Sequence, residues 1–121
     1  MAKKRRITRK SAKSKGRKGV TDVIKLIRAQ YPHWQEDEVF RPAGSQPGED
    51  IHFSPDARKE LNISIEVKKQ ESLQIWKALK QCEDNAKEGV PVLFFSRAHS
   101  KMYVALPAEE FLYICRYGAD K

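Results

Sequence analysis

Hydrophobic and polar residues alternate most regularly between Leu61 and Lys68. Every odd-numbered position in this stretch is apolar and every even-numbered position is polar. Because the side chains of a strand point alternately to opposite faces, the pattern predicts a half-buried β-strand. The apolar face is expected to pack into the core. The polar face carries Asn62, Ser64, Glu66 and Lys68.

Apolar residues recur every three or four positions in three other stretches, which predicts helices. Tyr31-Pro32 ends the first of them and Gly89 ends the second. Trp76 falls on the apolar stripe of the second helix and is therefore expected in the core. The predicted helices are Thr21–Gln30, Leu73–Glu88 and a C-terminal segment after Pro107 in which Phe111, Leu112 and Ile114 pack.

Shorter apolar stretches predict the remaining strands. The run from Val90 to Phe95 is apolar throughout, as expected of a central strand covered on both faces. Proline and glycine mark a loop over residues 42–48, and residues 54–58 are expected to form a turn. Further strands are predicted at Glu38–Arg41, Ile51–Ser54 and Met102–Leu106. The order α-β-β-β-α-β-β-α indicates an α/β fold in which helices flank a mixed sheet.

The composition restricts the class of protein. A chain of 121 residues, 40% of them hydrophobic, forms one domain with a modest core. No stretch reaches the roughly 18 apolar residues of a membrane span, and the basic N-terminus lacks the apolar segment of a secretory signal. Cys82 and Cys115 suit neither a disulfide framework nor a zinc finger. We therefore expect a cytoplasmic protein without membrane association.

The positive charge is concentrated at the N-terminus. The net charge is +8, yet residues 20–121 carry 14 basic against 16 acidic residues. Residues 1–19 are therefore interpreted as a flexible basic arm that binds the phosphates of a nucleic acid, and residues 20–121 as the folded domain. The basic residues of this arm are Lys3, Lys4, Arg5, Arg6, Arg9, Lys10, Lys13, Lys15, Arg17 and Lys18.

Two acids and a lysine are expected to meet at one corner of the sheet. Glu66 and Lys68 share the polar face of their strand. If Ile51 and Phe53 face the core, Asp50 faces the other way. A hairpin between residues 50–54 and 61–68 would then bring Asp50 close to Glu66. Two carboxylates with the backbone carbonyl of Val67 suit a hard divalent cation such as Mg²⁺, and a neighbouring lysine would orient a water.

The same residues resemble the PD-(D/E)XK nuclease superfamily. The resemblance rests on Gly48-Glu49-Asp50 followed, after fifteen residues, by Glu66-Val67-Lys68. Several further segments are similar in their order to archaeal-type Holliday-junction resolvases and their phage-borne relatives. These segments are Lys15-Gly16, Ile24-Lys25-Leu26-Ile27, Arg41-Pro42-Ala43-Gly44-Ser45, Ile65-Glu66-Val67-Lys68 and Gly89-Val90-Pro91-Val92-Leu93.

This resemblance implies a restriction-endonuclease-like core, a homodimer and cleavage of branched DNA, in a bacterial, archaeal or phage-infected cell. It implies that Asp50, Glu66 and the Val67 carbonyl hold Mg²⁺ or Mn²⁺, and that Lys68 positions the hydrolytic water. It also implies that Arg41 and Ser45 contact the DNA backbone, and that Gln81 (or Gln74) lies in the catalytic site. The family's first-helix glutamate is missing, because Val20 occupies its place, and Asp22 is the acid that could substitute for it.

Two other functions remain open. The first is a less selective nuclease of the same superfamily that acts on single-stranded or duplex DNA. The second is a non-catalytic nucleic-acid-binding protein in which the arm provides the binding. A pure binder has no need of Asp50 and Glu66, because their charges repel phosphate unless a cation is present. Arg97 and Lys101 flank a turn and are further candidates for DNA contact.

Overall fold

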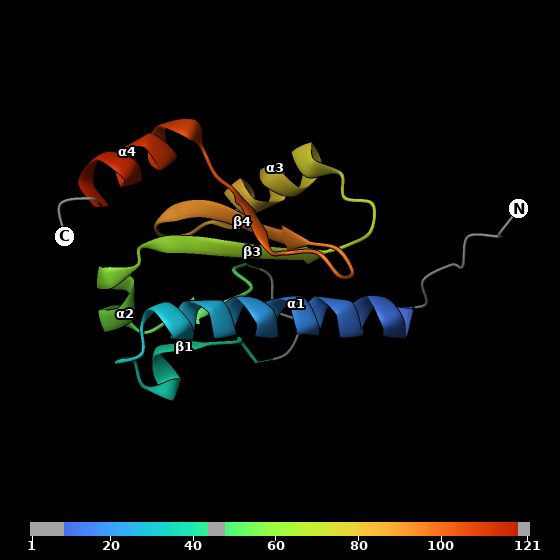
Figure 1. Cartoon of the computed structure of the whole chain (residues 1–121), viewed down its shortest axis with the longest axis horizontal. Helices are drawn as coiled ribbons and strands as arrows, with labels where there is room; N and C mark the ends of the chain where they lie inside the picture. The colour runs from blue at the N-terminus through green and yellow to red at the C-terminus, as the bar shows by residue number, and fades with distance from the viewer. Residues whose placement is uncertain (1–8, 44–47, 119–121) are drawn as a thin grey trace, which may run out of the picture.

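The fold is known from a computed structural model that describes residues 9–43 and 48–118, with side chains from residue 16 onward. It is an α/β protein with two small sheets, which confirms the predicted class (Figure 1). In chain order the elements are α1 (Arg9–Gln30), the 3-10 turn η1 (Glu36–Glu38), β1 (Val39–Phe40), β2 (His52–Phe53), α2 (Pro55–Glu60), β3 (Ile63–Lys69), α3 (Ile75–Asn85), β4 (Val90–Ser96), β5 (Tyr103–Ala105) and α4 (Ala108–Gly118).

The larger sheet has the order β3-β4-β5. Strands β3 and β4 are parallel, with Glu66 opposite Leu93, whereas β4 and β5 are antiparallel. Helix α1 lies on one side of this sheet, and α3 and α4 lie on the other (Figure 1). The apolar run from Val90 therefore forms the central strand, as predicted.

The predicted hairpin between residues 50–54 and 61–68 is wrong. Strand β2 pairs with β1 instead, in a separate two-stranded sheet. The cause is local: residues 54–58 do not form the predicted turn, because Ser54 caps helix α2 and accepts a hydrogen bond from the Ala57 N–H. Pro55 at the first helical position also favours a helix there. This helix separates the two segments and prevents a tight hairpin.

Helix α1 is longer than predicted, which corrects part of the expected flexible arm. It begins at Arg9, so residues 9–19 are helical, whereas residues 1–8 lie outside the described chain. Gly19 is buried, and a β-carbon there would lie 3.1 Å from Cγ1 of Val67. Its missing side chain lets α1 approach β3 closely. Once this part of the helix is fixed by packing, extending it needs no new nucleation, and lysine and arginine, which make up most of residues 9–18, are good helix formers.

The core has two parts on opposite faces of the β3-β4-β5 sheet. Val23 and Ile27 of α1 pack with Ile65 and Val67 on one face. On the other face, Ala78 and Cys82 of α3 pack against Leu93. The polar side of β3 therefore also lies in the interior of the protein, and Glu66 is only 4% exposed.

Two packing predictions from helical spacing are wrong. Trp76 is 82% exposed, because α3 turns Ala78 and Cys82 toward the sheet. Helix α4 packs none of its apolar residues: Phe111, Leu112 and Ile114 are all exposed. No helix in the described ranges is both long enough and apolar enough to span a bilayer.

The two thiols are expected to differ in reactivity. Burial, followed by the nearby Glu66 charge, raises the pKa of Cys82 to about 11, whereas Cys115 is exposed. Because the thiolate is the reactive form, one thiol of the native protein should react quickly with Ellman's reagent and the second only upon unfolding. Cys115→Ser should remove the fast phase. Fast labelling of both thiols would contradict the packing of α3 on β3.

Candidate metal site and nucleic-acid interface

Asp50 is held at the edge of β3 that does not pair with β4. Its backbone N–H donates to the carbonyl of Ile65 at 3.0 Å, and its Oδ2 accepts from the N–H of Val67 at 2.8 Å. Asp50 thus takes the place of a neighbouring strand at this edge, although β2 itself pairs elsewhere.

The same bonds fix the direction of the Val67 carbonyl. In an extended strand, the N–H and C=O of one residue point to the same edge, and those of the next residue point to the other. Because the N–H of Val67 donates to Asp50, its carbonyl also faces the Asp50 edge. A main-chain oxygen and a carboxylate therefore lie together at the unpaired edge of β3.

Glu66 and Lys68 share one face of β3, as predicted. Lys68 Nζ lies 3.6 Å from Glu66 Oε1, and Asn85 Nδ2 of α3 donates to Glu66 Oε2 at 3.4 Å. The sequence interpretation missed Asn85. The signal was present, since Asn85 follows Ala78 and Cys82 by seven and three residues and thus continues the buried face of α3.

The pKa values of both carboxyl groups, Asp50 and Glu66, are raised. Burial raises the pKa of Asp50, although the bond from Val67 and the charge of Lys68 oppose this rise. Burial is also the main cause of the raised pKa of Glu66, and the negative charge of Asp50 raises it further. The charge of Lys68 and the hydrogen bonds therefore do not fully offset the cost of ionising these two neighbouring carboxyl groups.

A pocket of about 300 Å³ opens beside Lys68, and neither Asp50 nor Glu66 is among its lining residues. Lys68 lines it from β3 and Gln81 from α3. Lys77, Gln74 and Gln70 also line it, so the pocket offers two ammonium groups and several amides. Such groups donate hydrogen bonds and attract anions, and the pocket can accept a phosphodiester.

Asp22 lies elsewhere. It pairs with Lys69 of β3 at 3.7 Å and with Lys18 at 3.6 Å. Lys69 and Lys68 are neighbours on one strand, so their side chains point to opposite faces. The structure therefore places Asp22 on the α1 side of the sheet, away from Glu66, which corrects the suggestion that it supports the metal site.

The expected DNA contacts lie partly within the described chain. Arg41 Nη2 donates to the carbonyl of Arg17 and to Thr21 Oγ1, and so ties the loop after β1 to α1. Ser45 lies outside the described residues. So do Lys3, Lys4, Arg5 and Arg6, while Arg9, Lys10, Lys13 and Lys15 belong to the described backbone of α1.

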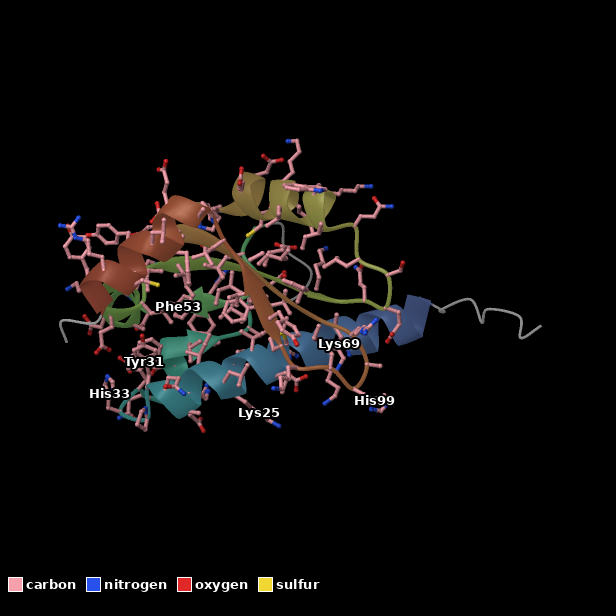
Figure 2. All side chains as sticks on the ribbon, turned by 45° about the horizontal axis from the view of Figure 1, so that its top comes forward. Lys25, Tyr31, His33, Phe53, Lys69 and His99 are labelled. Carbon is pink, nitrogen blue, oxygen red and sulfur yellow. The ribbon has the colours of Figure 1, made fainter. Side chains whose placement is uncertain are left out.

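The basic half of α1 projects from the same end of the sheet as the pocket. Gly19 lies against Val67 and Lys69, at the carboxyl end of β3, and residues 9–18 continue beyond this point (Figure 1). At 1.5 Å per helical residue, this extension is about 15 Å long. Lys69 of β3 lies at this end of the sheet, and so does His99 of the turn between β4 and β5 (Figure 2). His33 lies at the opposite end.

Comparisons with known proteins add no family. No family model, no curated protein and no solved structure matches the chain. Among the described residues, no group of three or more His, Cys, Asp or Glu side chains is arranged to hold a metal ion. The candidate site has two carboxylates, which is the smaller set typical of Mg²⁺ sites that also use water and substrate phosphate.

Proposed function

We propose that this protein is a divalent-metal-dependent DNA endonuclease of the PD-(D/E)XK type, with a restriction-endonuclease-like core. The observation that carries the proposal is the convergence of Asp50, Glu66 and Lys68 at one edge of β3. The buried Glu66 and the partly buried Asp50 are costly to keep ionised near each other unless a cation joins them. Their purpose is therefore better explained by a metal site than by solubility or packing.

The residues present fit Mg²⁺ or Mn²⁺. Asp50 and Glu66 supply carboxylate oxygens, and the carbonyl of Val67 supplies a neutral one. All three donors are oxygens, which hard cations prefer. The Cys82 thiol lies near Glu66, but its pKa, raised to about 11, keeps it protonated and therefore a poor metal ligand. A bound ion would activate a water and neutralise charge on the scissile phosphate.

The other side chains of the site have separate tasks. Lys68 lies close to Glu66 and lines the pocket. It can therefore hold the attacking water and stabilise the negative charge that develops on the phosphate oxygens. Gln81 and Lys77 line the same pocket and hold the DNA backbone in register. Asn85 donates to Glu66 and acts as a positioning residue.

Branched DNA, and a four-way junction in particular, is the substrate class that we propose. The candidate site belongs to one small α/β domain, and such a domain can select its substrate by shape instead of by reading bases. The basic half of α1 extends from the pocket end of the sheet and supports contact with phosphates beyond the one that is cut.

The experiment compares a four-way junction, a flap, a single strand and a linear duplex at equal concentration, with Mg²⁺, with Mn²⁺ and with EDTA. We expect cleavage of the junction in either metal, none in EDTA, and the linear duplex to be cut at least about tenfold more slowly. Equal rates on all substrates would favour the less selective nuclease. DNA binding without cleavage in either metal would overturn the proposed nuclease activity and favour the non-catalytic nucleic-acid-binding protein.

Removal of residues 1–14 should weaken DNA binding without unfolding the domain. Seven basic residues are lost, and each lost phosphate contact should reduce the slope of log affinity against log salt by about 0.9. Fluorescence anisotropy over a salt series measures this slope, and circular dichroism checks the fold. Lys59→Gln, on exposed α2, is a matched control. An unchanged slope after truncation would show that this segment does not contact phosphates.

A further inference from the structure

A second pocket, of about 360 Å³, lies on the face of the sheet that α1 covers. Lys69 lines it from the end of β3 and Ser96 from the end of β4, where these two residues are neighbours in register. Its volume falls within the roughly 300–1,000 Å³ that is usual for small-molecule sites. The candidate metal site uses neither side chain, so this pocket, which we call the α1 pocket, needs an explanation of its own.

The α1 pocket has apolar walls. Leu26 and Ala29 line it from α1, and Met102 lines it from the segment before β5. Leu26 stays 50% exposed, because α1 turns Val23 and Ile27 toward the sheet instead. A ligand with an apolar surface would remove these walls from water, and that burial is favourable.

Polar groups of both kinds lie beside these walls. Lys69 Nζ is a hydrogen-bond donor and lies 3.7 Å from Asp22 Oδ2, which is an acceptor. Ser96 adds a hydroxyl group. Among the side chains that the structure describes, Ser96 Oγ is buried and has no hydrogen-bond partner. An unpaired buried hydroxyl is costly, so a ligand that offers it a partner gains affinity.

A nucleobase matches this combination of groups. It is a planar ring with apolar faces, and its edge carries hydrogen-bond donors next to acceptors. Proteins that hold an unpaired base enclose its faces between apolar or aromatic side chains and bind its edge through hydrogen bonds. Leu26 and Met102 provide such apolar contacts, and Lys69 with Asp22 provides a donor and an acceptor for the edge.

The position of the α1 pocket also fits a DNA strand. Lys68 and Lys69 are neighbours on β3, so their side chains point to opposite faces of the sheet. The α1 pocket and the pocket around Lys68 therefore flank the same strand end. The basic stretch of residues 9–18 leads to the α1 pocket, since Lys18 lies 3.6 Å from Asp22. Lys25 lines the pocket from the same helix (Figure 2), and these cations attract the phosphates that flank a base.

We propose that the α1 pocket binds an unpaired nucleobase of the DNA strand whose phosphate enters the pocket around Lys68. The inference rests on the proposed function, because it takes DNA as the substrate. It adds a source of selectivity. A base that is already unpaired at a branch or a bulge enters a pocket at low cost, whereas a base inside a duplex must first leave its stack and its partner.

The test compares three DNA duplexes, which contain a single unpaired adenine, an abasic residue in its place, or no interruption. Fluorescence anisotropy in EDTA measures the dissociation constants without cleavage. The wild type should bind the unpaired adenine at least about fivefold more tightly than the abasic residue, as expected when apolar or aromatic side chains hold one base. Leu26→Ala should lose most of this ratio. Leu112→Ala, which shortens a similarly exposed leucine of α4, is the matched control and should keep it.

A second variant fills the pocket instead of opening it. Ala29→Leu adds bulk from the exposed side of α1 and should also abolish the preference for the unpaired adenine. Circular dichroism shows whether each variant is folded. Equal binding of the adenine and abasic duplexes by the wild type, or a preference that both variants keep, would overturn the base pocket and leave the nuclease proposal standing. Failure to bind any of the three duplexes would overturn both.

A free nucleotide is the other source of the same chemistry. Isothermal titration calorimetry with deoxyadenosine monophosphate should show no saturable binding below about 1 mM, because a single nucleotide lacks the phosphate contacts of a strand. Tighter binding that Leu26→Ala removes would assign the α1 pocket to a free nucleotide and overturn the DNA strand as its ligand.

Discussion

In the presence of a chelator, Glu66→Gln should unfold at a higher temperature than the wild type, and with Mg²⁺ restored it should cleave DNA at least about 1,000-fold more slowly. The stabilisation follows from the raised pKa of Glu66, which burial and Asp50 cause. Glutamine keeps the size of the side chain and removes the charge. For a chain of 121 residues, about 1 kcal/mol corresponds to a change of about 4 °C in the unfolding temperature.

The pH dependence of this difference has a defined sign. A carboxyl group whose pKa is raised by folding binds a proton more readily in the folded chain, so its ionisation costs stability as the pH rises through the folded pKa. The advantage of Glu66→Gln should therefore be full where the pH lies well above the folded pKa. It should shrink as the pH falls through the folded pKa and disappear below the ordinary value of 4.5.

Divalent ions should reverse the order of stability. Mn²⁺ binds the folded wild type and should raise its unfolding temperature, whereas Glu66→Gln should gain little. Asp56→Asn, which neutralises an exposed carboxylate of α2, is the matched control and should respond to Mn²⁺ as the wild type does. If Glu66→Gln destabilises the metal-free protein and still responds to Mn²⁺, Glu66 is a structural residue.

Arg58→Met should cost about 3–5 kcal/mol of the free energy of unfolding. Arg58 Nη2 lies 3.1 Å from Glu49 Oε2, and the two side chains are only 13% and 8% exposed. Arg58 Nη1 also donates to the carbonyls of Ile63 and Glu88. Methionine can fill part of the space but leaves the Glu49 carboxylate buried without its partner, and two carbonyls lose a donor.

The same substitution should impair the candidate site, because Glu49 immediately precedes Asp50. We expect Arg58→Met to lower the Mn²⁺-induced stabilisation even where the protein is fully folded. Chemical denaturation measures the free energy, and Lys59→Met on the exposed side of α2 is the control. Adding Glu49→Leu should recover part of the lost stability. A loss below about 1 kcal/mol would show that the ion pair does not fix this loop.

Several structural features were predictable because they depend on local sequence. The alternation at 61–68 places Glu66 and Lys68 on one face whatever the strand pairs with, and the structure has them 3.6 Å apart. The apolar run from Val90 forms a central strand for a similar reason, since few environments other than a covered strand accommodate it. The nuclease function itself stays a proposal.

Other features could not be predicted, because they depend on partners distant in the sequence. Asp50 was expected near Glu66 through a hairpin, yet it reaches β3 through two hydrogen bonds of its own after α2 has displaced the turn. Trp76 lies at the right spacing for a core residue, but spacing gives only the period of a helix, and packing against β3 sets which face is buried. The amphipathic pattern of α4 likewise gave no indication that its own chain leaves it uncovered.

The sequence alone therefore established the strand that carries Glu66 and Lys68, the α/β class and the concentration of basic residues near the N-terminus. Side-chain alternation and charge content are properties of neighbouring residues, which explains why they are readable without coordinates. The meeting of Asp50 with Glu66, the separation of Asp22 from both, and the exposure of α4 arose from the folded arrangement. Each depends on which surfaces are removed from water when distant segments pack together. The free energy of this burial depends on both packing partners and cannot be assigned to one segment of the sequence.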